Sequence, residues 1–444
     1  MIMALKRPGQ SCPADLRRSR GVVRQRLARR LPFAVLLASA VLVATAGSAG
    51  ASSSSGRSRS GGVVKLGYIG SISGPLAAIG IEQLDGAKVA VEEINASGGV
   101  DGHKKIRLVT ADDKLTPSVA AAEARTMMSS GIKLIFGMVS SANCLAVAPV
   151  VQKLGGVTIG SVCSSTPLVG PKRVAKTYFT DSATNGVSCR AEAEVLAKEY
   201  PNLKTIYIFG YDYITGHEIA SYCIHDMKAD GMKQLRIAKT FWVPLTSDTF
   251  SPQVSALADS LSGPSTGRAL FIVTYGTGTT TFLKEAAPYK LLQKFQAVFT
   301  NGGYVTSSTA LNGAVPKVWD SYEYFPSVIV NKAVNNRFVK LYDKFKVGPP
   351  NSWSYDTWLS VMSYAKAIDA AKSTNPHKVA AAMTHITITG PLGPVKYNPR
   401  THQPTTPTLI FETVGDPTSS TNKLKLLKWD LVSPETNKII KSGS

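Results

Sequence analysis

Short apolar runs alternate with amphipathic stretches along the chain from residue 63 to about residue 160. In the first amphipathic stretch, apolar residues recur at i, i+3, i+4 and i+7 from Ala87 to Ile94, which indicates a helix. The glycine pair at 98–99 ends it. The predicted strands are Val63–Ile69, Ile106–Thr110, Lys133–Phe136 and Val157–Ile159, with a loop at Gly70–Gly80 and further helices at Val119–Ser129 and Cys144–Leu154. This rhythm predicts a parallel sheet with helices on both faces.

A second series of the same kind follows. It comprises helix Ser188–Tyr200, strand Thr205–Phe209, helix His217–Ala229, strand Leu270–Tyr275, helix Thr281–Ala287, strand Ala297–Thr300, and helices Val334–Phe345 and Thr357–Ala371. A chain of 444 residues is too long for one compact core. The sequence therefore predicts an α/β protein of two Rossmann-like lobes with a central cleft, where small molecules usually bind.

The chain begins with a pattern typical of a secretory signal peptide. Met1–Arg30 is basic, Leu31–Ala46 is apolar, and Ala-Gly-Ala at 49–51 is a small-x-small cleavage site. We assign residues 1–51 to the signal peptide and 52–62 to a flexible Ser/Gly/Arg linker. A retained anchor is the alternative, although the apolar run is short for a membrane span. No cysteine follows this run closely, so we expect no lipid-modified N-terminus, and a secreted, extracellular or cell-envelope-associated protein.

The net charge of +21 is spread over the whole chain. Residues 1–51 contain nine of the 50 Lys and Arg residues and one of the 29 acidic residues. This leaves 41 basic and 28 acidic residues, a net charge of +13, for the rest. Such a surface either keeps the protein soluble or lies against an anionic envelope. No basic block is interleaved with stacking aromatics, so we predict no nucleic-acid binding.

Four cysteines follow the leader, and an even number in an exported protein favours disulfides. Three pairings are possible, and we favour those that keep both partners within one lobe. Zinc is the alternative, but no C-x-x-C occurs and the histidines are scattered, so we predict no metal site. The favoured pairs are Cys144–Cys163 and Cys189–Cys223.

Small hydroxyl residues follow several predicted strands. They lie at Ser71–Gly74, Ser140–Asn143 and Ser161–Thr166. Loops after strands meet at one edge of a parallel sheet, and helix N-termini there bind carboxylates and phosphates. The alternative is helix N-capping, which uses the same residue types. Aromatic residues that could close over a ligand are Tyr211, Tyr213, Tyr275, Tyr304, Trp353 and Tyr355.

Motifs of common enzyme classes are missing. The string GSISG at 70–74 has isoleucine where a G-x-S-x-G elbow needs serine. The string GTGTTT at 276–281 lacks the last glycine of a dinucleotide-binding loop, and no Walker A motif occurs. We therefore predict that the protein is not an enzyme. A secreted hydrolase remains the less favoured alternative.

Three segments between about Val63 and Leu168 carry a more specific signal: SISGPLAAIG, DGAKVAVEEINASGGVDGHKKIRLVTADD and SGIKLIFGMVSSANCLAVAPVVQKLGGVTI. They resemble the branched-chain amino acid-binding family of ABC transporters, and GPLGPVKYNPR resembles that family's closing segment. The resemblance implies a type I periplasmic-binding fold without a cofactor. It also implies a three-strand hinge, which we place near Asp181, Phe325 and Val395. The N-terminal lobe is then 63–180 plus 326–394, and the C-terminal lobe is 181–325 plus 395–444.

The same resemblance implies a set of ligand-binding positions. Ser141, the backbone of Val162 and the side chain of Ser164 would hold the ligand carboxylate. Tyr275 would come from the second lobe, and Trp353 would border the pocket for the ligand's side chain.

Three positions depart from the family's pattern. Ile79 stands where amino-acid binders commonly have an aromatic residue, and Thr215 stands where a tyrosine is common, although Tyr213 is close. Gly302 falls about where an acid often meets the α-ammonium group. A buried ammonium without an acidic partner is costly. The pattern thus keeps the contacts for a carboxylate but not the contact for an ammonium group. We expect an amino acid or a related small carboxylic acid, and our hypothesis from these departures is an organic acid without an amino group, such as an aromatic or short aliphatic acid.

Together these features predict the extracellular solute-binding component of an ABC importer. It would be a monomer that closes about its hinge on a small carboxylate and docks on the permease subunits. The alternative is an extracellular ligand-sensing subunit of a signalling receptor, which the same fold and site would serve.

Overall fold

The computed structural model describes residues 62–444, apart from 323, 346–347 and 421. The predicted signal peptide and all but the last residue of the predicted linker lie outside the described residues. Within the described range, no helix combines the length and the apolar character needed to cross a membrane.

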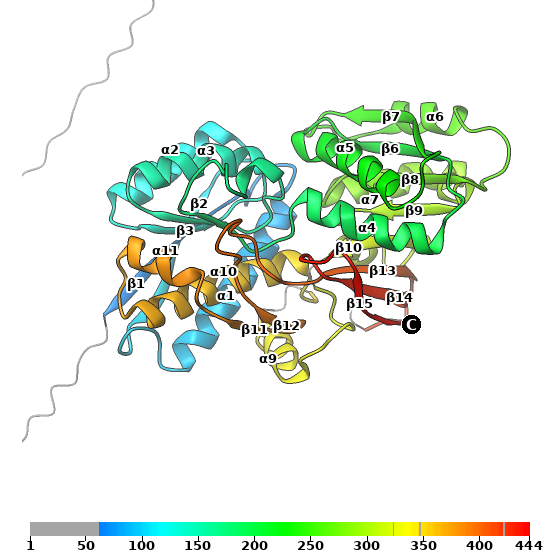
Figure 1. Cartoon of the computed structure of the whole chain (residues 1–444). Coiled ribbons are helices and arrows are strands. Elements are labelled where there is room, and N and C mark those ends of the chain that lie inside the picture. Colours follow the sequence, from blue (N-terminus) through cyan, green and yellow to red (C-terminus); the bar gives the residue numbers. More distant parts are fainter. Residues whose placement is uncertain (1–61, 323, 346–347, 421) are drawn as a thin grey trace, which may run out of the picture. The chain divides into compact units, whose positions relative to one another are not determined.

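The first lobe is built on a five-stranded parallel sheet with the order β2-β1-β3-β4-β5 (Figure 1). Successive side chains of a strand point to opposite faces, so Tyr68 of β1 packs in one core and Ile69 in another. The strands are β1 (Val63–Gly70), β2 (Lys105–Asp112), β3 (Leu134–Gly137), β4 (Val157–Gly160) and β5 (Tyr178–Thr180).

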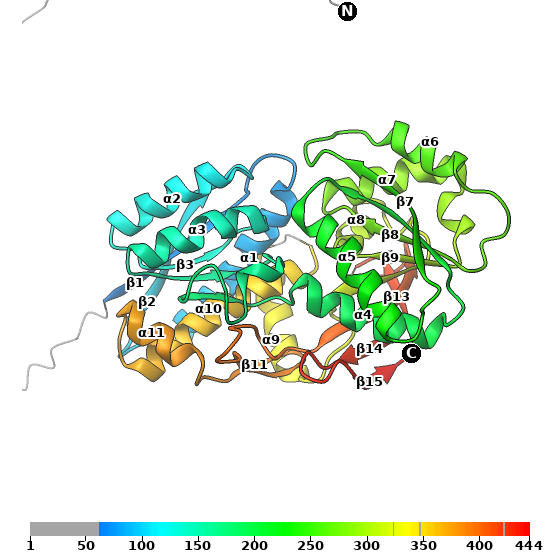
Figure 2. The ribbon, with the colours of Figure 1, turned by 45° about the horizontal axis from the view of Figure 1, so that its top comes forward.

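Helices cover both faces of this sheet, as predicted. Figure 2 shows α2 and α3 on one side and α10 and α11 on the other. Gly86 of α1 lets this helix approach α10, because a Cβ there would lie 1.9 Å from the carbonyl oxygen of Ser354. The elements are α1 (Ala77–Ala96), α2 (Pro117–Ser129), α3 (Ser141–Lys153), α9 (Lys332–Asp343), α10 (Ser352–Ala371), α11 (Pro376–Met383) and the hairpin β11 (Ile388–Gly390) and β12 (Gly393–Val395).

The second lobe is built on an eight-stranded sheet with the order β15-β14-β13-β10-β9-β8-β6-β7. The five strands from β7 to β10 are parallel, and β13, β14 and β15 add antiparallel. The strands are β6 (Thr205–Tyr211), β7 (Arg236–Val243), β8 (Arg268–Val273), β9 (Ala297–Thr300), β10 (Val318–Tyr322), β13 (Thr408–Gly415), β14 (Leu424–Val432) and β15 (Ile439–Gly443). The helices are α4 (Asn185–Glu199), α5 (Ile214–Ala229), α6 (Ser251–Asp259), α7 (Thr277–Ala286) and α8 (Tyr304–Ala310).

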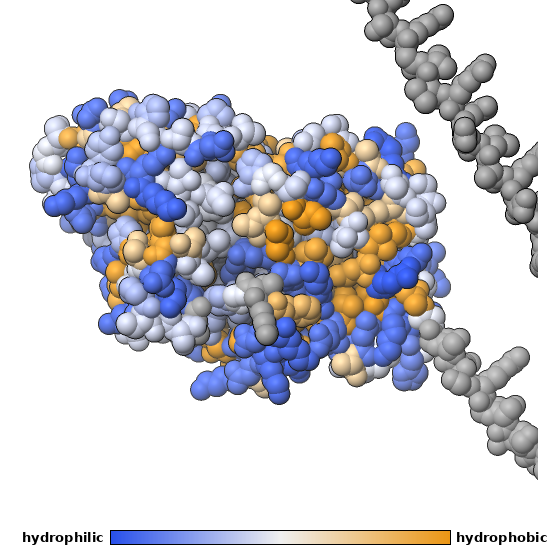
Figure 3. All heavy atoms as spheres, turned by 180° about the vertical axis from the view of Figure 1, so that it is seen from behind, coloured by the Kyte–Doolittle hydropathy of each residue, from blue (hydrophilic) through white to orange (hydrophobic). Residues whose placement is uncertain are grey.

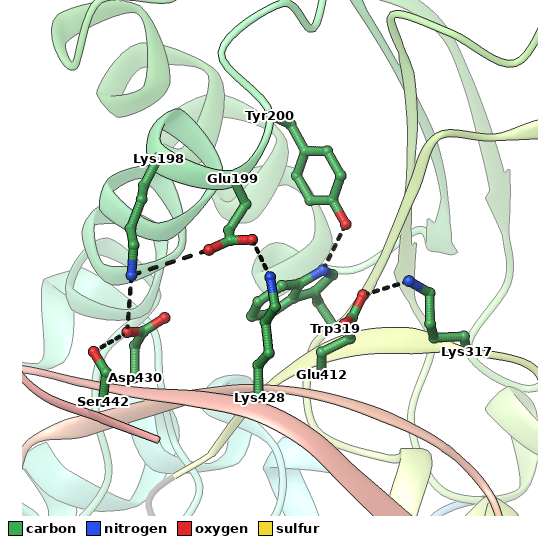
Figure 4. A network of polar contacts seen from close by, with 9 residues as sticks. All are labelled: Lys198, Glu199, Tyr200, Lys317, Trp319, Glu412, Lys428, Asp430 and Ser442. Carbon is green, nitrogen blue, oxygen red and sulfur yellow. Dashed lines mark hydrogen bonds and ion pairs between the residues drawn. The ribbon is translucent and has the colours of Figure 1, made fainter. Parts of the chain in front are cut away.

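Polar contacts fasten the antiparallel strands to α4 (Figure 4). Lys428 Nζ lies 2.6 Å from Glu199 Oε2, and Lys198 Nζ lies 3.4 Å from Asp430 Oδ1. These lysines are half exposed, so each pair contributes little to stability by itself. The strands are held mainly by buried residues such as Phe411 and Leu431.

The chain passes between the lobes three times, after β5, after β10 and after β12. A mixed α/β architecture of two lobes is thus the fold that the sequence predicted. The residue at which each lobe begins and ends stays a prediction.

The structure corrects the sequence analysis at several elements. The loop predicted at Gly70–Gly80 is wrong at its end, because α1 begins at Ala77, directly after Pro75 and Leu76. Strands β5, β7, β10, β13, β14 and β15 and helices α6, α8 and α11 were not predicted. Strand β7 lies at the sheet edge with most side chains exposed, so it lacks the apolar run that marks a buried strand.

Hydrophilic residues interrupt the apolar ones on the face shown in Figure 3. Among the described residues, the large apolar side chains that are exposed come from separate elements and loops. They are Val63, Ile81, Leu154, Ile237, Tyr289, Val330 and Ile440.

Candidate functional site

A cavity with an empty volume of about 760 Å³ lies between the two lobes. Its walls come from residues that follow the carboxyl ends of strands in both sheets, for example Val162 after β4 and Tyr275 after β8. Ligands of open α/β sheets bind at this edge, because helices begin there. The apolar part of the lining is Leu76, Ile79, Val139, Val162, Leu245 and Trp353.

The cavity brings together seven of the eight positions that the sequence proposed for the ligand. The seven are Ile79, Val162, Ser164, Thr215, Tyr275, Gly302 and Trp353. Their individual contacts with a ligand stay predictions. Of the six aromatic candidates, Tyr213, Tyr275 and Trp353 line the cavity, whereas Tyr211, Tyr304 and Tyr355 are buried outside the lining. Tyr322, at the end of β10, is a lining aromatic that the sequence analysis missed.

The eighth position, Ser141, lies behind the wall. It is buried, and its Oγ accepts a hydrogen bond from the backbone N–H of Ser165 at 3.2 Å. Its neighbour Ser140, the N-cap of α3, lines the cavity instead, and Ser140 Oγ lies 3.2 Å from the hydroxyl of Tyr213. Successive residues at a helix start point in different directions, so Ser140 and not Ser141 lines the cavity in the predicted loop 140–143, and a contact of Ser141 with the ligand stays a prediction.

Tyr275 contributes a hydroxyl from the second lobe. Within the described part of the chain this hydroxyl is buried and has no hydrogen-bond partner. Burial raises the pKa of Tyr275 well above its usual range, so the group is a neutral donor at any physiological pH. A buried hydroxyl without a partner is a natural contact for a ligand in the cavity.

Two buried carboxylates support the second-lobe wall from behind. Glu192 Oε1 accepts from Ser321 Oγ at 2.7 Å and from Asn301 Nδ2 at 3.2 Å. Asp320 Oδ1 accepts from the backbone N–H groups of Gly302 and Ser321, each at 3.0 Å. Asn301, Gly302 and Ser321 all line the cavity. Burial raises the pKa of Glu192 and of Asp320 to about 7.

Asp356 is an acidic lining residue that the sequence analysis missed. It lies on α10, three residues after Trp353, and only 1% of its surface is exposed. Residues at i and i+3 share one face of a helix, so the spacing from Trp353 was a usable signal. Among the described residues of the lining there is no Lys, Arg or His. The cavity wall therefore carries a negative rather than a positive side chain.

Two disulfides hold elements that border the cavity, and they are the pairs favoured above. Cys144 of α3 is bonded to Cys163 in the loop after β4, and Cys189 of α4 is bonded to Cys223 of α5. Glu192 lies next to the second pair, but both sulfurs are used by the bridge and so cannot ligate a metal.

The family model described as "Periplasmic binding protein" matches residues 63–418. The protein named "Leu/Ile/Val-binding protein homolog 8" of Brucella abortus (strain 2308) is 28% identical over 341 residues, which cover 73% of this chain and 81% of that protein. The match is to binding proteins and not to enzymes, in agreement with the sequence analysis.

Two solved structures share the fold. An ABC-transporter solute-binding protein of R. palustris in complex with benzoate has a TM-score of 0.70 at 20% identity and covers 82% of this chain and 96% of its own. An amino acid ABC transporter substrate-binding protein from Pseudomonas fluorescens Pf-5 has a TM-score of 0.71 at 19% identity and covers 83% and 96%. At these identities the likeness establishes the architecture alone.

Proposed function

We propose that this chain, which belongs to the periplasmic binding protein family, is the solute-binding component of an ABC importer and binds a small carboxylate-bearing solute between its lobes. The observation that carries the proposal is the cavity itself. Both lobes line it, its walls are largely apolar, and its polar groups are mainly neutral hydroxyls and amides. Sites of this composition bind small molecules and fix their orientation through a few polar contacts.

Neutral donors of the first lobe would hold the carboxylate. Ser140, Ser164 and Val162 line the cavity, and the two serine hydroxyls and the backbone N–H of Val162 would be the donors. Ser140 caps α3, whose N-terminal N–H groups favour an anion. Ser141 would act indirectly, by fixing the loop that carries Ser164 through its bond to Ser165.

The charge of the lining favours a solute that also carries an ammonium group. A solute with only a carboxylate would bring a second negative charge close to Asp356 in a site without a basic side chain. An α-amino acid is neutral overall and offers its ammonium to this carboxylate. We therefore propose that the carboxylate of Asp356, on α10, binds the ammonium group of the solute. Gly302 stands about where an acid often does so in the family, but it has no side chain. The relatives fit either class, since one is named for leucine, isoleucine and valine and another is in complex with benzoate.

The rest of the proposal concerns export and movement. The segment 1–51 would direct export, and 52–62 would link the lobes to it, so that the mature protein works as a monomer outside the cytoplasm. Closure would turn about the passages near Asp181, Phe325 and Val395, between lobes 63–180 plus 326–394 and 181–325 plus 395–444. The closed form would dock on the permease subunits.

Isothermal titration calorimetry of the mature protein, starting at Ser52, tests the solute class. The panel pairs L-leucine with 4-methylpentanoate and L-phenylalanine with 3-phenylpropanoate, so each pair differs only in the amino group. We expect the amino acid of a pair to bind at least about tenfold more tightly, which corresponds to 1.4 kcal/mol. Benzoate is added as a short aromatic acid.

The variant Asp356→Asn should remove that preference within each pair. Asp369→Asn is the matched control, because Asp369 is an exposed residue of the same helix. Equal binding of both members of a pair by the unmodified protein would contradict the role of Asp356. Absence of binding to the whole panel would contradict the proposed solute class.

A further inference from the structure

Helix α5 of the second lobe reaches across the cavity at its N-terminus. The hydroxyl of Tyr213, the N-cap residue, lies 3.2 Å from Ser140 Oγ and accepts from the backbone N–H of Ala142 at 3.4 Å. Both partners belong to the start of α3 in the first lobe. The start of α5 therefore touches the helix terminus that is proposed to face the carboxylate.

One turn further along α5, the carboxylate of Glu218 makes stronger contacts with the first lobe. Its Oε1 accepts from Ser165 Oγ at 2.7 Å, and its Oε2 accepts from the backbone N–H of Thr166 at 3.2 Å. Oε2 also accepts from Asn185 Nδ2 at 2.7 Å, at the start of α4. Hydrogen bonds to an ionised acceptor are about twice as strong as those between neutral groups. The contacts of Glu218 are thus the strongest set between the lobes in this region.

Each of these contacts ends next to the cavity. Ser164, which precedes Ser165, lines the cavity, and so do Asn185 and Ser140. The backbone N–H of Asn185 in turn donates to the carbonyl oxygen of Ser164 at 2.7 Å. Thr215, between the two contact residues on α5, is also a lining residue. Residues at the start of α5 therefore hold in place several of the residues that would surround the solute.

Two contacts of α7 and α8 with the first lobe are weaker. Thr277 Oγ1 donates to the carbonyl oxygen of Pro75 at 3.3 Å, and Thr306 Oγ1 donates to Glu82 at 3.4 Å. Each is a single, long hydrogen bond, whereas Glu218 accepts two hydrogen bonds from the first lobe. If the lobes separate, the bonds of Glu218 to Ser165 and Thr166 must break, since donor and acceptor lie on different lobes.

We infer that residues 213–218 form a latch that keeps the lobes closed over the solute, and that Glu218 is its main positioning residue. The inference rests on the proposed function, because closure matters only if a solute binds between the lobes. A latch that forms after the solute has entered should slow the release of the solute and have little influence on its entry. It should also favour the closed form of the unliganded protein.

Stopped-flow fluorescence with L-leucine tests the latch, with benzoate as the probe if only acids without an amino group bind. Glu218→Gln places an amide donor against donors, and we expect the off-rate to rise at least about tenfold while the on-rate changes less than about threefold. Glu218→Asp keeps the charge on a shorter side chain, so its off-rate should lie between those of the unmodified protein and Glu218→Gln. Glu199→Gln is the control, because Glu199 lies in the network of Figure 4, where it pairs with Lys428. An off-rate within twofold of the unmodified protein for Glu218→Gln would overturn the latch.

Small-angle X-ray scattering of the unliganded proteins separates the latch from the solute. We expect Glu218→Gln to show a larger radius of gyration than the unmodified protein and Glu199→Gln. Equal radii would overturn the latch even if no solute of the panel bound. If thermal denaturation shows that Glu218→Gln does not fold, Ser165→Ala replaces it, because this variant removes the hydrogen bond between Ser165 and Glu218 from the first-lobe side. The same increases in off-rate and in radius of gyration are then expected, and their absence would overturn the latch.

Discussion

The two walls of the cavity are supported in different ways. The first-lobe wall includes residues at the starts of helices and in loops, such as Ser140 and Ser164, and its loops are fixed by hydrogen bonds of hydroxyl and backbone N–H groups and by the Cys144–Cys163 bridge. The second-lobe wall, including Asn301, Gly302 and Ser321, rests on two buried carboxylates. The second wall therefore depends on two buried carboxyl groups whose pKa is raised to about 7, whereas the first wall is held mainly by hydroxyl and backbone groups and a disulfide. A ligand site between two lobes can combine both kinds of support.

The largest effects should come from removing the disulfides one at a time. The bridges close segments of 19 and 34 residues, and in the chain-entropy model each stabilises the folded state by about 3–4 kcal/mol. We expect the double replacements Cys144→Ser with Cys163→Ser, and Cys189→Ser with Cys223→Ser, to lower the free energy of unfolding by similar amounts in urea titrations. Only the first pair should also weaken solute binding directly, because Cys163 lies between Val162 and Ser164. Equal losses of affinity after the two double replacements would show that the disulfides of the two walls do not differ in their effect on solute binding.

Removing the charge of Glu192 should have an intermediate effect on stability. Its pKa rises from 4.5 to about 7 on folding, so between these pH values the unfolded chain loses its proton while the folded protein keeps it. The contribution is therefore fully present below about pH 4.5, falls as the pH rises, and is lost above about pH 7. Glu192→Gln should remove this decline and stabilise the protein at pH 8 by about 3 kcal/mol, the free energy that corresponds to this pKa shift.

The midpoint of thermal unfolding, measured from pH 4.5 to pH 8, checks this prediction. Glu194→Gln is the control, since it removes a carboxylate from the same helix that is paired with Lys438 near the surface. Parallel pH profiles for Glu192→Gln and the unmodified protein would mean that the second wall does not rest on a titrating group.

The smallest effects should separate two neighbouring serines of the first wall. Ser140→Ala should weaken solute binding by about 1 kcal/mol, because it removes a hydroxyl that faces the cavity. Ser141→Ala should instead lower stability by about 1 kcal/mol, because it leaves the N–H of Ser165 without its acceptor. Calorimetry and urea denaturation of both variants measure the two quantities. The reverse assignment would show that Ser141, not Ser140, reaches the solute.

The sequence predicted the structure where apolar residues recur at the spacing of a helix or strand, or where hydroxyl residues cluster after a strand. Apolar runs and periodicity located strands β1 to β4 of the first sheet and the helices between them, and hydroxyl residues after β3 and β4 located two loops of the cavity. Helices were placed too late by several residues. For example, α3 begins at Ser141 and α10 at Ser352, because the first turns carry polar residues and the apolar period begins only later. These first turns are the part that forms the site.

The support of the second wall could not be predicted. Glu192 and Asp320 are separated by more than 120 residues, and each stands in a segment whose neighbours give no sign that a carboxylate is buried. Their role depends on the packing of α4 against the second sheet, which is a long-range property. Tyr322 was missed for the same reason, since only the fold shows which end of β10 faces the other lobe, whereas the spacing of Asp356 from Trp353 was a signal that the sequence did contain.

The three passages between the lobes also constrain the order in which the protein can be completed as it emerges during synthesis. Phe136 of β3 packs against Tyr364 of α10, and β10 of the second sheet pairs with β13, which begins at Thr408. The core of the first lobe thus includes segments that are synthesised after most of the second lobe. The sheet of the second lobe is complete only when its last strands have been synthesised. Neither lobe can therefore finish early, because an incomplete chain lacks parts of both cores until its last segments have been synthesised.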